Sequence, residues 1–341
     1  MTATPPMLPE PARLLSGPTP VRRLDALCTE NVELWLKDDG LTHPEYGGNK
    51  VRKLEFILGV ALARGARRLV TSGAAGSHHV LCTALMARHF GLPVAAVLCP
   101  QPHTEHAEQM LRAILASGAE VIPTSSYAGV ALATARVLRA GDRLIPPGGS
   151  DVWGTLGYVR CLRELLAQVD AGELPLPDEI VVAVGSGGTA AGLLAGCLRE
   201  GIRTRVVGVD VATSRWVARS VVLGLAHRAL ARDGGAPDWG RLASGLVLDG
   251  AFKGGGYGEP SDAGRRAEAE AGRVGLTLDP TYTAKAFAAA LRRRDRAGQA
   301  QKLLYLHTLS NATPGPGAPP TAVFGVPELR RLLTPTRALA R

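Results

Sequence analysis

Residues 179–192 read EIVVAVGSGGTAAG: an apolar run, a glycine-rich turn and the start of a helix. A short run rich in branched apolar residues is typical of a buried strand. Glycines in such a turn let backbone N–H groups approach an anion, and the N-terminus of the next helix adds a favourable partial charge. The sequence therefore predicts a strand over 179–184 and a helix from Thr189. The turn is expected to bind phosphate through Ser186, Gly187, Gly188 and Thr189. A tight turn that binds no ligand is the alternative.

The same alternation of short apolar runs and helical periods continues on both sides of this unit. Further strands are predicted at 68–72, 93–99, 120–123, 205–211 and 303–308, and helices at 76–90 and 104–117. Strands joined through helices form parallel sheets with helices on both faces. The predicted fold class is therefore α/β. The proline-rich stretch 312–320 is expected to be a late surface loop.

Composition limits the possible classes of protein. Of 341 residues, 46% are hydrophobic and 20% charged, which excludes a disordered chain and predicts about two domains. No linker separates the two, so we expect them to be interleaved. No apolar run is long enough for a transmembrane helix. The first residues also lack the order of a signal peptide, so we expect a cytoplasmic protein.

The net charge of +9 is concentrated near the end of the chain, because residues 291–341 contain nine Lys or Arg and two Asp or Glu. Aromatic residues make up only 4%, which argues against nucleic-acid binding by base stacking. No nucleic-acid-binding motif accompanies the charge. We interpret the basic segment as a solvated helix end and a tail, and expect no nucleic-acid partner.

A second motif, GGNKVRKLE, spans residues 47–55. Apolar residues recur after it with helical spacing, which places Lys50 in the first turn of an amphipathic helix. The positive end of the helix dipole lowers the pKa of an amine there, which suits a lysine that forms a Schiff base. A solvated surface lysine is the alternative.

A third motif, TSGAAGSHHV, spans residues 71–80 at another strand-to-helix turn. Ser77 and the following N–H groups suit a carboxylate, and Ser77 also suits the helix N-cap. Adjacent helical residues point about 100° apart, so His78 and His79 do not share one metal ion easily. We expect no metal site.

The glycine turn also half-matches a dinucleotide-binding fingerprint. Gly185 and Gly187 are followed by Asp210 at the end of the next predicted strand, as in nicotinamide-binding oxidoreductases. Ala190 occupies the third glycine position of that fingerprint. An NAD-dependent oxidoreductase is therefore an alternative class.

Taken together, the motifs resemble the 1-aminocyclopropane-1-carboxylate deaminase/D-cysteine desulfhydrase family of pyridoxal-phosphate enzymes, which has a tryptophan-synthase-β-like fold. The resemblance covers nearly the whole chain in order, and GGNK-x-RKLE is its most specific part. The matching segments are Gly17-Pro-Thr-Pro20, 47–55, Gly73 to Val80, Pro147 to Ser150, Gly157-Tyr158, 185–189, Tyr257 to Pro260, Asp279 to Lys285 and His307-Thr308.

The resemblance implies pyridoxal 5′-phosphate as cofactor. Lys50 would hold it covalently and act as the base at Cα, Asn49 would lie beside it, and residues 186–189 would bind its phosphate. Ser77 would hold the substrate carboxylate. Tyr257 and Tyr282 would line the substrate pocket.

The resemblance also implies two αβ domains with the cofactor in the cleft between them. The large domain would comprise residues 1–50 and 165–341, and the small domain residues 51–164. A homodimer that acts on a small amino acid is expected.

The sequence departs from the family pattern at three places. His78 stands where relatives have Asn beside the cofactor's phenolic oxygen; imidazole can also donate there, but it is larger and titrates. Gly76 stands where Gln is usual. The residues after Thr308 are Leu-Ser-Asn instead of Gly-Gly, so that turn is expected to differ.

Two positions separate the branches of the family. This chain has Tyr282-Thr283 and His307-Thr308 at these positions. Deaminase-like sequences have Tyr-Glu and His-Leu there, and desulfhydrase-like sequences have Tyr-Thr and His-Thr. Thr283 and Thr308 are thus expected near the cofactor. A neutral hydroxyl near the pyridine nitrogen makes the ring a weaker electron sink, which suffices when a good leaving group departs from Cβ.

We therefore predict a carbon–sulfur lyase that performs α,β-elimination on D-cysteine or a related D-amino acid, giving pyruvate, ammonia and sulfide. A 1-aminocyclopropane-1-carboxylate deaminase or a β-replacement enzyme is the nearest alternative. A non-catalytic member of the fold that binds an amino acid is the third class considered.

Overall fold

A computed structural model describes residues 8–211 and 214–334 of the chain. The chain forms two compact units that are interleaved in sequence. Of the described residues, unit 1 contains Leu8, 15–53 and 150–311, and unit 2 contains 9–14, 54–149 and the last part of the chain from 312. One boundary, between Lys53 and Leu54, falls inside a continuous helix, α1 (Asn49–Ala63).

Unit 1 is built on a six-stranded sheet in the order β1-β2-β11-β8-β9-β10. The edge strand β1 pairs antiparallel to β2, and the other neighbours are parallel. The strands are β1 (Val21–Arg23), β2 (Val32–Asp38), β8 (Glu179–Val184), β9 (Arg205–Asp210), β10 (Leu246–Asp249) and β11 (Gln301–His307). All parallel neighbours therefore end at the same edge of the sheet.

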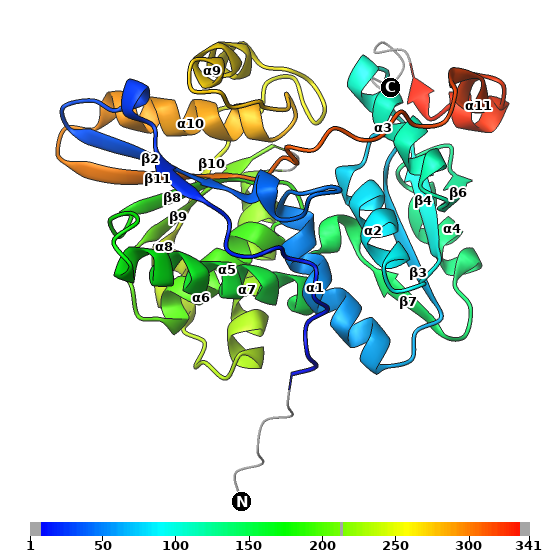
Figure 1. The fold of residues 1–341 in the computed structure, drawn as a ribbon, viewed down its shortest axis with the longest axis horizontal. Helices are drawn as coiled ribbons and strands as arrows, with labels where there is room; N and C mark the ends of the chain where they lie inside the picture. Colours follow the sequence, from blue (N-terminus) through cyan, green and yellow to red (C-terminus); the bar gives the residue numbers. More distant parts are fainter. Residues whose placement is uncertain (1–7, 212–213, 335–341) are drawn as a thin grey trace, which may run out of the picture. The chain divides into compact units, whose positions relative to one another are not determined.

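Helices cover both faces of this sheet (Figure 1). One face carries α9 (Asp262–Gly272) and α10 (Thr283–Arg296); the other carries α5 (Val152–Asp170), α6 (Gly188–Arg199), α7 (Arg215–Arg232) and α8 (Trp239–Gly245). Two short 3₁₀ helices, η1 (Asp25–Leu27) and η2 (Asp39–Leu41), flank β2. The core between the sheet and α10 includes Leu34, Val207, Phe287 and Leu303. Burial of such apolar side chains is the main favourable term in folding.

Unit 2 is built on a parallel sheet in the order β6-β4-β3-β7. Its strands are β3 (Arg68–Ala74), β4 (Val94–Cys99), β6 (Glu120–Pro123) and β7 (Asp142–Ile145), and its helices are α2 (His78–Arg88), α3 (Glu105–Ala116), α4 (Gly129–Val137) and the 3₁₀ turn η3 (Pro147–Gly149). Every residue of β4 is buried, as expected for a central strand with both faces covered.

The last described segment belongs to unit 2. It comprises α11 (Pro320–Phe324), α12 (Pro327–Arg330) and β12 (Leu333–Thr334). Strand β12 pairs parallel to β5 (Gln101–Pro102), and α11 packs against α3. Val323 and Leu332 are fully buried, so this segment is part of the unit's core.

The two sheets with their parallel neighbours and covering helices confirm the predicted α/β class. The predicted strands and helices are all present, with ends shifted by a few residues. The main differences are that α2 begins at His78 and that β11 ends at His307, which leaves Thr308 after the strand. The predicted loop 312–320 is irregular up to 319, and Pro320 begins α11, where the fixed φ of proline suits the first helical position. Among the described residues, no helix has both the length and the apolarity needed to cross a bilayer.

The units divide the chain differently from the predicted domains. The boundaries lie after Lys53 and before Ser150 instead of after 50 and 164, and residues 9–14 and the chain from 312 group with unit 2. The predicted large and small domains, with the cofactor between them, stay a prediction.

Candidate active site

Lys50 and Asn49 lie at the first turn of α1, directly after a constrained glycine. Gly48 has φ +91°, and a Cβ there would lie 2.8 Å from the Thr308 carbonyl oxygen. The Asn49 N–H donates to this carbonyl over 3.2 Å. The turn therefore depends on glycine, and it joins the start of α1 to the residue that follows β11.

The side chains of this turn meet the glycine-rich turn of α6. Lys50 Nζ donates to Asn49 Oδ1 over 2.8 Å, and Asn49 Nδ2 donates to Thr189 Oγ1 over 3.0 Å. Asn49 thus links the Lys50 amine to Thr189, and the structure brings together three of the predicted site residues.

The glycine-rich turn between β8 and α6 gathers hydroxyl and amide groups. Ser186 Oγ lies 2.7 Å from Ser150 Oγ, which also accepts from Gly188 N over 3.2 Å. Gly187 has φ +84°, and a Cβ on Gly188 would lie 2.6 Å from Ser150 Oγ. The close approach of Ser150 to the N-terminus of α6 therefore requires glycine at 188.

Lys53 supplies a buried cation at this turn. Its side chain is 2% exposed, and its Nζ donates to Ser150 Oγ over 3.2 Å. Burial lowers the pKa of Lys53 well below its ordinary value, and the charge of Lys50 lowers it further, while Asp151 opposes both. A phosphate dianion bound at the turn would offset these costs of a buried charge.

This donor set fits a phosphate group. It combines the N-terminus of a twelve-residue helix, the hydroxyls of Ser150, Ser186 and Thr189, and the ammonium of Lys53; anions bind at such helix termini through backbone N–H groups. Sequence reasoning gave no role to Lys53 or Ser150, although both stand in motifs quoted above. Their contact spans 97 residues, so no local pattern reveals it.

Tyr257 and Tyr282 form a pair beside the glycine-rich turn. Their hydroxyl oxygens lie 2.6 Å apart, and their rings meet edge to face with centroids at 5.8 Å. A Cβ on Gly185 would lie 2.9 Å from Cε1 of Tyr282. The Tyr282 ring therefore packs on the glycine that begins the predicted phosphate-binding turn.

Thr283 is buried and bonded locally. Its hydroxyl donates to Asp279 Oδ2 and accepts from Asp279 N, each over 2.6 Å. Its carbonyl accepts a hydrogen bond from the Tyr305 hydroxyl over 3.3 Å. Thr283 therefore fixes the start of α10, and the fully buried His307 lies close by, with Nδ1 3.4 Å from Tyr305 Oη. Burial lowers the pKa of His307, and the charges of Asp38 and Asp279 oppose this.

Ser77 and His78 belong to unit 2. Ser77 is the N-cap of α2, and its Oγ accepts from Val80 N over 3.3 Å. His78 Nε2 lies 3.0 Å from His106 Nε2, whereas His79 Nε2 lies 2.9 Å from Thr71 Oγ1. The adjacent histidines thus have different partners, and Ser77 has the predicted capping geometry.

A further departure from the family pattern, Gly76, is explained by its neighbours in unit 2. Gly76 N donates to Gln101 Oε1 over 2.9 Å, and a Cβ on Gly76 would lie 2.9 Å from Gln101 Nε2 and 3.0 Å from Ala107 Cα. A glutamine at 76 has no room beside them. Gln101 from β5 instead supplies a side-chain amide next to Ser77.

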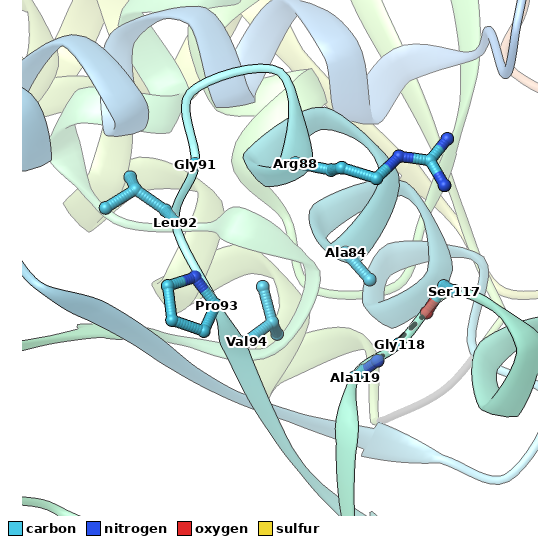
Figure 2. A pocket seen from close by; sticks show the side chains of 9 residues that line it. All are labelled: Ala84, Arg88, Gly91, Leu92, Pro93, Val94, Ser117, Gly118 and Ala119. Carbon is cyan, nitrogen blue, oxygen red and sulfur yellow. Dashed lines mark hydrogen bonds between the residues drawn. The ribbon is translucent and has the colours of Figure 1, made fainter.

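A pocket of unit 2 contains none of the predicted site residues. It lies between the end of α2, the start of β4 and the turn after α3 (Figure 2). Its volume is about 280 Å³. Its lining residues are Ala84, Arg88, Gly91, Leu92, Pro93, Val94, Ser117, Gly118 and Ala119. Arg88 is the one charged residue among them, so the pocket lacks the groups that the predicted chemistry needs.

Comparison with known proteins identifies the family. Residues 12–308 match the family described as pyridoxal-phosphate dependent enzyme. The chain belongs to this family. The cofactor of the enzyme is accordingly pyridoxal phosphate, as predicted, and the nicotinamide alternative is set aside.

Relatives narrow the family further. The enzyme is 34% identical over 309 residues to a putative 1-aminocyclopropane-1-carboxylate deaminase of Pyrococcus abyssi (86% of this chain, 90% of the relative). It is 36% identical over 310 residues to a D-cysteine desulfhydrase of Yersinia pestis (86% and 92%). The crystal structure of a deaminase homologue covers 95% of this chain and 96% of its own, with a TM-score of 0.77 and 30% identity. The enzyme is therefore a pyridoxal-phosphate-dependent lyase of the deaminase/desulfhydrase family.

Proposed function

We propose that this enzyme catalyses α,β-elimination from D-cysteine or a closely related D-amino acid such as β-chloro-D-alanine. The products from D-cysteine would be pyruvate, ammonia and sulfide. The observation that carries this choice is the environment of Thr283. Its hydroxyl is buried against the Asp279 carboxylate at 2.6 Å, so a glutamate there, as in deaminase-like sequences, would bring two carboxylates together at a large electrostatic cost.

The chemistry of the cofactor fits this choice. When bound, pyridoxal phosphate supplies an electron sink for negative charge at Cα. A sulfur substituent at Cβ departs readily once the Cα proton is lost. Elimination therefore needs only a weak electron sink, which the ring provides with neutral hydroxyls at Thr283 and Thr308. Opening a cyclopropane has no such leaving group and would require a stronger electron sink.

We assign the steps at the substrate as follows. The Lys50 amine, held by Asn49 at 2.8 Å, takes the proton from Cα. The Cβ–S bond then breaks, and the sulfur leaves with the bonding electrons and takes up a proton. The remaining enamine reacts with water to give pyruvate and ammonia, which balances the reaction.

The other residues bind and orient in this proposal. Residues 186–189 with Lys53 and Ser150 hold the phosphate, Asn49 and His78 contact the cofactor ring, and Ser77 binds the substrate carboxylate. Tyr257 and Tyr282, with their hydroxyls paired at 2.6 Å, line the substrate pocket, and one phenol donates to the departing sulfur.

The test is a product assay with purified enzyme on D-cysteine, L-cysteine, D-serine, β-chloro-D-alanine and aminocyclopropane carboxylate. We expect pyruvate from D-cysteine and β-chloro-D-alanine. The visible absorbance band of the enzyme should be bleached by borohydride and be missing in Lys50→Ala. Formation of 2-oxobutanoate from aminocyclopropane carboxylate, without pyruvate from D-cysteine, would identify a deaminase instead.

Two controls separate the remaining alternatives. Added thiol or cyanide that becomes bonded to Cβ would indicate β-replacement. A bound cofactor without turnover of any amino acid would indicate a non-catalytic member of the fold. We further propose that the enzyme is a cytoplasmic homodimer. Native mass spectrometry of the cofactor-loaded enzyme measures the number of subunits.

A further inference from the structure

The loop between β10 and α9 carries Tyr257 but has little conformational preference of its own. It contains glycines at 254, 256 and 258 with φ of +65°, +154° and +80°. Such values favour glycine, and a glycine-rich segment loses more conformational entropy on ordering than any other. Tyr257 is 40% exposed. Contacts with the rest of unit 1 must therefore hold this loop in one conformation.

Lys285 from the first turn of α10 supplies these contacts. Its side chain is fully buried, and its Nζ donates to the carbonyl oxygens of Lys253 over 2.8 Å and Gly256 over 3.0 Å. These carbonyls lie on both sides of two glycines. Hydrogen bonds from a charged donor are about twice as strong as neutral ones.

Burying the Lys285 ammonium costs free energy of desolvation. Burial lowers the pKa of Lys285, and the Lys253 charge also lowers it, while Asp279 and Glu259 oppose this. An apolar side chain of similar size would avoid the desolvation cost. The ammonium is therefore explained by the two loop carbonyls that it binds.

The N-cap residue of α10 also holds the tip of the loop. This residue, Tyr282, meets Tyr257 hydroxyl to hydroxyl at 2.6 Å. The N-terminal end of α10 thus binds the loop at two points: Lys285 binds the loop backbone, and Tyr282 binds the Tyr257 side chain.

We propose that Lys285 is a positioning residue that fixes the 253–258 loop and thereby sets the place of the Tyr257 hydroxyl beside Tyr282. The effect of Lys285 on turnover rests on the proposed function, in which Tyr257 lines the substrate pocket. The effect of Lys285 on the conformation of the loop is independent of that function.

The first experiment measures amide hydrogen exchange in the cofactor-loaded enzyme. Lys285→Met keeps roughly the length of the side chain and removes the N–H donors, and Lys285→Gln keeps an uncharged amide donor group. Exchange in 253–258 should rise by about tenfold or more in Lys285→Met and by less in Lys285→Gln. Exchange in β11 should stay unchanged. Lys302→Met, at an exposed position of β11, is the matched control and should behave as wild type.

The second experiment is a double-mutant cycle on pyruvate formation. Lys285→Met and Tyr257→Phe should each lower kcat/KM, and the double variant should be no slower than the poorer single variant, because both act through one hydroxyl. Unchanged exchange in 253–258, or fully additive losses, would overturn the proposal. If Lys285→Met does not fold, the Lys285→Gln series decides by the same two readouts. If no amino acid is turned over, the proposed function fails and the exchange result still decides the role of Lys285.

Discussion

Arg52 shows at the residue scale why the GGNKVRKLE motif contains more than its lysines. Its guanidinium is buried, donates to Asp39 Oδ1 over 2.8 Å and bonds Glu164 Oε2 over 2.7 Å. Lys37 Nζ binds the other Glu164 oxygen over 2.6 Å, and the Tyr158 hydroxyl donates to Asp39 Oδ2 over 2.6 Å. This network ties the start of α1, and with it Lys50, to β2 and α5. A buried ion pair of this kind is costly to break by removing one partner.

Glu164 makes the network sensitive to acid. Burial opposes its ionisation, but the hydrogen bonds and charges of Arg52 and Lys37 outweigh this and lower its pKa from 4.5 to about 2. A depressed carboxylate pKa stabilises the folded state above the unfolded pKa, and the stabilisation is lost as pH falls through the folded pKa. We expect the free energy of unfolding to fall between about pH 5 and pH 2, with on the order of 3 kcal/mol due to Glu164.

Glu164→Gln tests this assignment by urea unfolding across that pH range. At pH 7 the variant should be less stable by about 3 to 5 kcal/mol, because it leaves two cations with reduced compensation. At low pH the two proteins should converge. Equal pH dependence of wild type and variant would show that other carboxylates control acid unfolding.

Gly188→Ala tests the proposed phosphate site with a single methyl group. The new Cβ would lie 2.6 Å from Ser150 Oγ and 3.1 Å from Lys53 Nζ, so both donors must move. We expect the affinity for pyridoxal phosphate to fall about tenfold, since a hydrogen bond to a charged group contributes about 1.5–3 kcal/mol. Titration of the apoenzyme, followed by visible absorbance, measures this.

Gly224→Ala is the matched control for that substitution. Gly224 lies inside α7, and a Cβ there would meet nothing within 4 Å. Alanine in a helix interior is more stable than glycine by about 1 kcal/mol. The control should therefore gain stability and keep its cofactor affinity. A Gly188→Ala enzyme that binds the cofactor as wild type does would place the phosphate elsewhere.

At the scale of elements, the N-cap residue of α2, Ser77, has one observed role and one proposed role. The Ser77 hydroxyl caps the helix through Val80 N and is proposed to bind the substrate carboxylate. Ser77→Ala should cost about 1 kcal/mol of stability and raise KM for D-cysteine about tenfold. Asp238→Ala removes the cap of α8, where Asp238 Oδ1 accepts from Arg241 N, and should cost stability without changing KM. A rise in KM in both variants would mean that KM reports stability only.

The elements that sequence reasoning found share one property, which is an apolar run or helical period with little interruption. Strands β3, β4, β6, β8, β9 and β11 all contain such runs. Strand β2 reads VELWLKD, and a lysine near its end is typical of an exposed strand or a loop. In the structure the Lys37 ammonium is instead buried against Glu164. A buried charge is recognised only through its distant partner, here 127 residues away.

The candidate site shows the same limit. Lys50, Asn49 and Thr189 were predicted from glycine-rich turns and from family resemblance, and the structure brings them together. Lys53, Ser150 and Gln101 act through contacts that no local pattern encodes. The neighbours of Gly76 explain in addition why this chain departs from its family there, because the Gln101 side chain takes the space of the usual residue.

At the scale of the whole molecule, the chain returns to unit 2 after completing unit 1, and this return forms part of the unit's structure. Gln101 N donates to the Leu332 carbonyl oxygen over 3.0 Å. The Gln101 side chain accepts from Gly76 N, next to Ser77. The segment 320–334 is thus connected to the turn that is proposed to bind the substrate carboxylate.

Two truncations separate the tail from this segment. Residues 335–341 lie outside the described part of the chain, and we predict that deleting them leaves thermal stability and cofactor binding intact. Deleting 320–341 removes the buried side chains of Val323, Leu332 and Leu333, each of which contributes about 1.5–3 kcal/mol when fully buried. The longer deletion should therefore lower the melting temperature and, through Gln101 and Gly76, raise KM for D-cysteine more than it lowers affinity for the cofactor.

Thermal unfolding, cofactor titration and pyruvate kinetics on both truncations measure the three effects. Loss of cofactor in the shorter truncation would show that the basic tail is structural after all, and an unchanged KM in the longer one would show that Gln101 holds its place without β12.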